Sequence, residues 1–179
     1  MVSIIQMLVP YIVLGSHLLF TILFLAVIFK NSWGRKITAF LGIHGIVLAL
    51  LVLLVAVGGS LFYSEIVGFE PCPLCWWQRL FIYPQLILFL TALKFKDRSV
   101  FRYAWRLSLL AAMIALYHQY VYMGGESLLP CTALGGACSK IYVFAFGYIT
   151  IPMMSLTISL YVLLLARADR IYRNENYHS

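Results

Sequence analysis

Two cysteines and an arginine at the start of an apolar run are the residues best suited to chemistry. In the segment EPCPLCWWQRLFIYP, two residues separate Cys72 from Cys75, and Arg79 follows four residues after the second cysteine. The prolines on either side of Cys72 are typical of a helix start, which predicts both thiols at a helix N-terminus, where backbone N–H groups and the helix dipole favour a thiolate. Arg79 would lie one turn along the same face as Cys75. Because both effects lower a thiol pKa and the thiolate is the reactive form, a reactive Cys-x-x-Cys pair is predicted.

The elements that hold this pair are predicted to be membrane-spanning helices. Of the 179 residues, 63% are hydrophobic and 11% are charged, whereas soluble domains average about 45–50% apolar and about 25% charged residues. Five apolar runs of roughly 20 residues are each long enough to cross a hydrocarbon core about 30 Å thick. The expected spans are 8–29, 39–62, 76–95, 104–123 and 142–166. An all-α integral membrane protein is predicted, because within lipid a helix pairs its own backbone groups. The first span has neither a basic leader nor a cleavage site, so we expect it to be retained.

Basic residues gather on one side of this topology. Eleven of the 13 lysines and arginines fall in the loops after spans one and three and in the C-terminal tail. They are Lys30, Arg35, Lys36, Lys94, Lys96, Arg98, Arg102, Arg106, Arg167, Arg170 and Arg173. The positive-inside rule makes this side cytoplasmic, which predicts the N-terminus outside and the C-terminus in the cytoplasm. The net charge of +7 thus indicates topology, and no nucleic-acid partner is expected.

All four cysteines fall on the opposite, outer side. Cys72 and Cys75 precede the third span, and Cys131 and Cys138 lie in the loop between the last two spans. Disulfides persist outside the cytoplasm, so Cys72–Cys75 and Cys131–Cys138 are the first expected pairs, although four cysteines allow three connectivities. The second loop contains proline and glycine, and we expect it to be accessible and mobile. Two structural staples are one interpretation, but a Cys-x-x-Cys loop closes too few residues to gain much entropy, which favours redox exchange or metal binding.

Polar residues inside the spans offer further candidates. Arg79 and His118 lie at similar depths, roughly 6–8 Å inside the outer boundary, so a common site is geometrically possible. Each also has a simpler interpretation: Arg79 as an anchor that reaches the headgroups, and His118 as the hydrogen-bonding partner of another helix. His17 and His44, in the first two spans, are interpreted as interhelical hydrogen-bonding residues.

The cysteine motifs resemble a known family. PCPLCWWQR, followed by HQYVYMGGESLLPCTALGGACSK, resembles the DsbB family of disulfide-generating membrane proteins, and the short second cysteine loop resembles its BdbC-type branch. The resemblance covers residues 39–166, which are expected to form a four-helix transmembrane bundle of DsbB type. Residues 1–38 would add one extra N-terminal transmembrane helix with a cytoplasmic loop, and residues 167–179 a cytoplasmic tail. Vitamin K epoxide reductase relatives carry their Cys-x-x-Cys late in the core, whereas here it comes first.

This resemblance implies a thiol:disulfide oxidoreductase of a bacterial cell membrane. Family members pass electrons from a soluble, thioredoxin-fold, DsbA-like oxidase on the outer face to a membrane quinone, either ubiquinone or menaquinone. By resemblance, the partner's thiolate attacks Cys131, and the released Cys138 attacks Cys72. Cys75 then becomes the thiolate that donates to the quinone. The residues implied to stabilise charge on the quinone are Arg79 and His118.

Two other functions are weighed against this one. Four thiolates could hold zinc or cuprous copper, but an oxidising face favours disulfides, so no metal site is expected. A transporter would need an acidic proton relay within a span. The acidic residues are all expected in loops or the tail: Glu65, Glu70, Asp97, Glu126, Asp169 and Glu175. Ion-coupled transport is therefore not expected.

Overall fold

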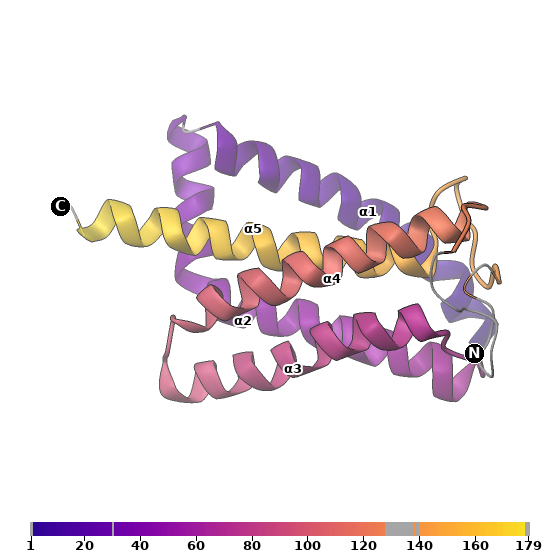
Figure 1. The fold of residues 1–179 in the computed structure, drawn as a ribbon. Helices are drawn as coiled ribbons and strands as arrows, with labels where there is room; N and C mark the ends of the chain where they lie inside the picture. Colours follow the sequence, from indigo (N-terminus) through magenta and orange to yellow (C-terminus); the bar gives the residue numbers. More distant parts are fainter. Residues whose placement is uncertain (1, 30, 128–137, 139, 178–179) are drawn as a thin grey trace.

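The computed structural model describes residues 2–29, 31–127, 138 and 140–177, which form a bundle of helices (Figure 1). The elements are α1 (Val2–Ile28), α2 (Ser32–Leu61), a π-helical turn η1 (Phe62–Ile66), α3 (Pro73–Phe95), α4 (Val100–Tyr122) and α5 (Ile151–Tyr177). Within the described residues, the only β-structure is an isolated bridge between Ala145 and Ile149. The predicted all-α class is confirmed.

Helix α5 lies at the centre of the bundle. It packs on α2 and α4 and also contacts α1 and α3, while α3 packs between α2 and α4 (Figure 1). Helices α2, α3, α4 and α5 each contribute fully buried side chains to the core, among them Leu53, Phe89, Ala104 and Val162. In lipid, such contacts stabilise a bundle by close packing rather than by removal of surface from water.

Helix α1 is peripheral to this four-helix core. Among the described helices it contacts only α2 and α5. Its apolar side chains are largely exposed, for example Ile12 at 68% and Leu18 at 66%. A helix that is apolar on all sides yet exposed is suited to a lipid environment.

Four helices are long and apolar enough to cross a membrane. The qualifying segments in the described part of the chain are Ile5–Ile28, Ser32–Ile66, Val100–Tyr122 and Ile151–Glu175. Helix α3 is not among them, although its 23 residues would extend about 35 Å. Its polar residues include Gln78 and Gln85, which are buried against the bundle. Gln85 accepts a hydrogen bond from Ser108 on α4 at 3.0 Å. The five-span topology therefore stays a prediction.

The segment before α5 folds differently from the predicted helix. Helix α5 begins at Ile151 rather than near residue 142. Phe146 and Gly147 adopt left-handed backbone conformations, with φ values of 52° and 76°. The Ala145–Ile149 bridge closes this turn. The apolar composition of the segment had predicted helix, but a left-handed pair cannot continue one.

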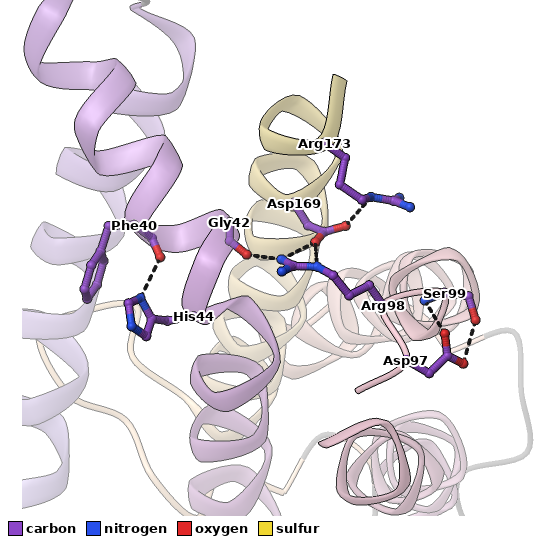
Figure 2. A network of polar contacts seen from close by, with 8 residues as sticks. All are labelled: Phe40, Gly42, His44, Asp97, Arg98, Ser99, Asp169 and Arg173. Carbon is purple, nitrogen blue, oxygen red and sulfur yellow. Dashed lines mark hydrogen bonds and ion pairs between the residues drawn. The ribbon is translucent and has the colours of Figure 1, made fainter. Parts of the chain in front are cut away.

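The far end of α5 corrects the expectation that every acidic residue lies in a loop or the tail. Helix α5 continues past the predicted end of the span, and Asp169 lies inside it, fully buried. Arg98 Nε donates to Asp169 Oδ1 at 2.8 Å, and Arg173 Nε lies 3.0 Å from Oδ2 (Figure 2). Arg98 Nη2 also donates to the carbonyl of Gly42 on α2. The carboxylate is paired with two cations, and this pairing ties α5 to α2 and to the loop before α4.

The two histidines of the first spans have different outcomes. His17 Nε2 lies 2.7 Å from Thr157 Oγ1 on α5, and its Nδ1 lies 3.1 Å from the hydroxyl of Tyr148. The predicted interhelical role of His17 is therefore confirmed. His44 instead contacts the carbonyl of Phe40 on its own helix at 3.2 Å (Figure 2). The interhelical prediction for His44 is wrong, because its side chain is on an exposed face of α2.

Candidate active site

Cys72 and Cys75 lie at the N-terminus of α3, as the flanking prolines predict. Cys72 is the N-cap residue, with φ −72° and ψ 168°, and Pro73 begins the helix. The Cys72 Sγ accepts the backbone N–H of Cys75 at 3.4 Å. Both cysteines are free thiols, and their Sγ atoms are 3.3 Å apart. The predicted Cys72–Cys75 disulfide is thus in its dithiol form here, with the two sulfurs already adjacent.

His118 on α4 faces this pair. Its Nε2 lies 3.5 Å from Cys72 Sγ, and its Nδ1 lies 3.0 Å from the side-chain amide of Gln78. His118 and Gln78 are 3% and 5% exposed. The imidazole is therefore held between a thiol and an amide in a buried position. Its depth in the span had suggested a common site with Arg79, and its contact with Cys72 was not predicted.

Gln78 is a site residue that sequence reasoning missed. A glutamine within an apolar helix, three residues after Cys75, is a signal that could have found it, because polar residues in spans usually face a partner. The identity of that partner depends on how α3 packs against α4. No spacing within α3 alone predicts it.

The electrostatics of the pair place the thiolate at Cys72. Its hydrogen bond with the Cys75 thiol, the nearby His118 and the Cys75 backbone N–H together hold the pKa of Cys72 well below its usual value, against the opposing effect of burial. The sequence had placed the favoured thiolate at Cys75, next to Arg79. The N-cap geometry favours Cys72 instead, because an ionised Cys72 accepts hydrogen bonds from both the Cys75 thiol and the Cys75 backbone N–H.

Cys138 reaches the same apolar cluster from the second cysteine loop. It is disulfide-bonded and only 2% exposed, and it clusters with Cys72, Leu74 and Val121. The expectation of an accessible second pair is therefore wrong for Cys138, because these apolar side chains cover its sulfur. Cys131 lies outside the described residues.

Tyrosine contacts hold the segment after Cys138 in place. The hydroxyl of Tyr122, at the end of α4, accepts the backbone N–H groups of Tyr142 at 2.8 Å and Val143 at 3.2 Å. The Tyr142 ring stacks on Phe69 with centroids 4.4 Å apart. Because Phe69 lies just before the Cys-x-x-Cys motif, these contacts join the two cysteine-bearing segments.

Arg79 points away from His118. Its Nε donates to Ser60 Oγ at 3.1 Å and its Nη2 to the Ser60 carbonyl at 3.3 Å, both on α2. The guanidinium also lies over the ring of Trp76, 5.1 Å from the centroid. No contact in the described part of the chain joins Arg79 to His118. The two predicted quinone-contacting residues therefore occupy different sides of α3.

A groove lies beside Arg79 on the outer surface of α3. It has a volume of about 480 Å³ and is almost wholly apolar. Its lining residues are Trp76, Trp77, Arg79, Leu80, Tyr83 and Pro84. Tyr83 donates to the same Ser60 hydroxyl at 3.1 Å, so one face of the groove is hydrogen-bonded to α2. The groove could hold a flat apolar ring against a cation.

Comparison with known proteins decides the family. Residues 43–168 match the family model described as "Disulfide bond formation protein DsbB". The chain belongs to the DsbB family. This match covers all four cysteines, Arg79 and His118.

Several curated relatives carry related names. The chain is 43% identical to the SPbeta prophage-derived disulfide bond formation protein B of Bacillus subtilis over 96 residues, which is 54% of this chain and 65% of that protein. It is 39% identical to disulfide bond formation protein C of the same organism over 109 residues, covering 59% and 78% of the two chains. It is 35% identical to a probable disulfide formation protein of Metapseudomonas resinovorans over 113 residues, covering 62% and 78%. No solved structure matches this chain with statistical significance.

Membership in the DsbB family agrees with the cysteine arrangement. Four of the described helices are long and apolar enough to cross a membrane. Together with the family and the names of the relatives, they support a role in disulfide bond formation at a membrane.

Proposed function

We propose that this DsbB-family protein reoxidises a DsbA-like, thioredoxin-fold dithiol oxidase on the outer face of a bacterial cell membrane and passes the electrons to a membrane quinone. One observation carries the proposal: Cys138 of the second pair lies in the same buried cluster as Cys72 of the first. Thiol–disulfide exchange needs the attacking and attacked sulfurs to meet. Their shared cluster supports exchange between the two pairs.

The first half of the proposed reaction is exchange with the partner. The partner's thiolate attacks Cys131 Sγ, the Cys131–Cys138 bond breaks, and Cys138 leaves as the thiolate. The partner's second thiol then attacks the mixed disulfide, which releases the oxidised partner and Cys131. Two electrons have then entered the protein.

The second half moves these electrons to the inner pair. Cys138 attacks Cys72 of the Cys72–Cys75 disulfide, and Cys75 leaves as a thiolate. Cys131 then attacks Cys138, which re-forms the outer disulfide and leaves Cys72 and Cys75 reduced. A disulfide at Cys138 with free thiols at Cys72 and Cys75 is the combination described above, and it corresponds to this electron-loaded form.

The quinone is proposed to receive the electrons from the reduced pair. A bound quinone would accept two electrons and two protons. The pair loses two electrons and two protons as the Cys72–Cys75 bond forms again. His118 is positioned to hold the Cys72 thiolate, and the Cys75 thiol is the more exposed of the two.

The residues beside Cys75 fit a quinone. The groove offers aromatic and aliphatic side chains for a ring and its tail. The Arg79 guanidinium carries five N–H donors, and the Nη1 group has no hydrogen bond in the described residues. We propose that Arg79 donates to a quinone oxygen, and that His118 acts on the thiolate from the other side of α3.

A four-thiolate metal protein is the less favoured function. A disulfide-bonded sulfur is not available as a thiolate ligand, and Cys138 is in that state. Family membership also favours redox exchange.

The decisive experiment combines trapping with turnover. The full-length protein in lipid nanodiscs, given a reduced thioredoxin-fold oxidase and a water-soluble quinone, should reduce quinone and oxidise the partner in equal amounts. Oxidised wild-type protein, given a reduced partner whose second active-site cysteine is replaced by alanine, should accumulate a mixed disulfide through Cys131, because the partner thiol that resolves it is gone. An adduct mapped to Cys72 or Cys75, or partner oxidation without quinone reduction, would contradict the proposed order.

A further inference from the structure

We propose that the reduced Cys72–Cys75 pair and His118 form a three-ligand site for a soft divalent cation of the zinc type. The site exists only in the dithiol form, and an occupied site prevents the disulfide from re-forming. The Sγ atoms of both cysteines and a ring nitrogen of His118 all lie within 4.8 Å of one another. This site is independent of whether a quinone accepts the electrons.

The distances suit a tetrahedral cation. With Zn–S of about 2.3 Å and Zn–N of about 2.0–2.1 Å, tetrahedral angles put sulfur and nitrogen about 3.5 Å apart and two sulfurs about 3.8 Å apart. Cys72 Sγ and His118 Nε2 are 3.5 Å apart, and the two Sγ atoms are 3.3 Å apart. The Cys72–His118 distance already fits, and the two sulfurs need to separate by about half an ångström. Cys75 Sγ, which lies within 4.8 Å of the ring nitrogen, needs to settle about 3.5 Å from it. Rotation of the Cys75 side chain, at the start of a helix, supplies that change.

Gln78 prepares the imidazole for this role. A zinc-bound histidine usually gives its other ring N–H to a neighbouring acceptor, which fixes the tautomer and directs the lone pair at the metal. Gln78 Nε2 lies 3.0 Å from His118 Nδ1, so the metal-bound form requires the Gln78 amide to turn over. With the amide oxygen turned to accept from Nδ1–H, the Nε2 lone pair faces Cys72. Among the described residues, the Gln78 amide nitrogen and His118 Nδ1 have no hydrogen-bonding partner other than each other.

Charge and burial favour a bound cation. Two thiolates neutralise a divalent ion, so the loaded site carries no net charge into an apolar cluster that includes Leu74 and Val121. Cys72 and His118 are buried while Cys75 is partly exposed, so a cation would enter beside Cys75. Three protein ligands with one open position is an arrangement found in zinc sites with two cysteines and one histidine.

Redox state controls the site. In the Cys72–Cys75 disulfide neither sulfur is a thiolate, so two of the three ligands are lost. The cation therefore binds the electron-loaded pair and holds both thiolates apart from each other and from any acceptor. Zinc-type cations would act as reversible inhibitors of the reduced form alone.

The test uses Co²⁺ as an optical probe in the full-length protein. A Cys131→Ser, Cys138→Ser background removes the other thiols. After reduction with a phosphine, one equivalent of Co²⁺ should produce tetrahedral d–d bands and a thiolate charge-transfer band, and one equivalent of Zn²⁺ should abolish them. The same protein oxidised to the Cys72–Cys75 disulfide should give neither band.

Variants distinguish a three-ligand site that includes His118 from a site made of the two thiols alone. Gln78→Leu should weaken binding by about 10–100-fold, the usual cost of losing a residue that supports a ligand, and His118→Gln should weaken it by at least as much. His44→Gln, the same change at a histidine that contacts only its own helix, should bind as the background does.

A measurement on the unmutated protein covers the case in which a variant does not fold. Zinc X-ray absorption of the reduced wild-type chain should show two sulfur neighbours and one imidazole. Absence of a charge-transfer band, equal binding by the oxidised protein, unchanged affinity in folded His118→Gln, or a zinc shell without imidazole would each overturn the proposal.

Discussion

Cys72 Sγ and His118 Nε2 lie 3.5 Å apart although the two residues are 46 positions apart in the chain. The contact joins the first residue before α3 to the last turns of α4. It brings a basic group to the N-cap sulfur, whose backbone contact with Cys75 already favours a negative charge. The reactivity of the pair is therefore a property of two helices rather than of the Cys-x-x-Cys motif alone.

Removal of His118 should raise the pKa of Cys72. The pKa of this thiol is lowered first by the Cys75 thiol and then by His118. Because His118 stabilises the thiolate, its loss shifts the equilibrium toward the thiol, so the thiolate appears at higher pH. We expect His118→Gln to raise the midpoint by about 1 unit, or ~1.4 kcal/mol. The ultraviolet thiolate absorbance of the reduced protein, followed against pH without the second cysteine pair, measures it. An unchanged midpoint would remove His118 from the electrostatics of the site.

Arg79 should affect quinone use but not exchange with the partner. Loss of a charge-assisted contact costs about 1.5–3 kcal/mol, so Arg79→Met should raise the apparent KM for quinone by roughly ten- to a hundredfold. Arg79→Lys keeps the charge without the planar fork and should retain some function. Quinone titrations, run beside a separate partner-exchange assay, check this. Because Arg79 is bonded to Ser60, Ser60→Ala is the matched control for lost anchoring. Wild-type kinetics in Arg79→Met would leave Arg79 as an interfacial anchor only.

His17 should couple α1 to the segment that precedes α5. Its ring nitrogens contact Tyr148 and Thr157. A double-mutant cycle of His17→Phe and Tyr148→Phe should give a coupling of about 0.6 kcal/mol, the size typical of hydrogen bonds between membrane helices. Thermal unfolding in detergent provides the free energies. His44→Phe is the control, and a coupling of zero would mean that the contact adds no stability.

The orientation can be tested at the start of α2. Ser32 is exposed at the first turn of that helix, in the loop predicted to face the cytoplasm. The Ser32→Cys variant should resist an impermeant thiol reagent in intact cells and react after permeabilisation. Labelling in intact cells would reverse the orientation and place the four native cysteines in the cytoplasm.

The residue pattern around Cys72 predicted the start of α3. The contacts of α3 with its neighbouring helices could not be predicted from that pattern. Proline placement and the Cys-x-x-Cys spacing located the helix start next to Cys72, since both are determined by backbone geometry. The spacing of four residues put Arg79 near Cys75 but could not tell which neighbouring helix its guanidinium would reach. In the structure the guanidinium donates to Ser60 on α2.

The same limit applies to buried polar residues. Depth along the helix put His118 level with Arg79, because rise per residue is nearly constant, but depth does not say which neighbour a side chain faces. Gln78 escaped notice since its importance lies in a contact with another helix. Asp169 was assigned to the C-terminal tail because charged residues usually lie outside a span. Its two arginine partners, one of them 71 residues away, make burial possible.

The Asp169–Arg98 pair has a consequence for biosynthesis. Arg98 is made long before Asp169, and until α5 has emerged and packed, its guanidinium has no carboxylate and remains hydrated. Closure of the end opposite the cysteines therefore waits for the last helix. A chain that stops before residue 169 leaves this arginine without its partner, at an end where α2 and α5 should meet. Such an incomplete chain would lack the ion pair that joins α5 to the loop before α4.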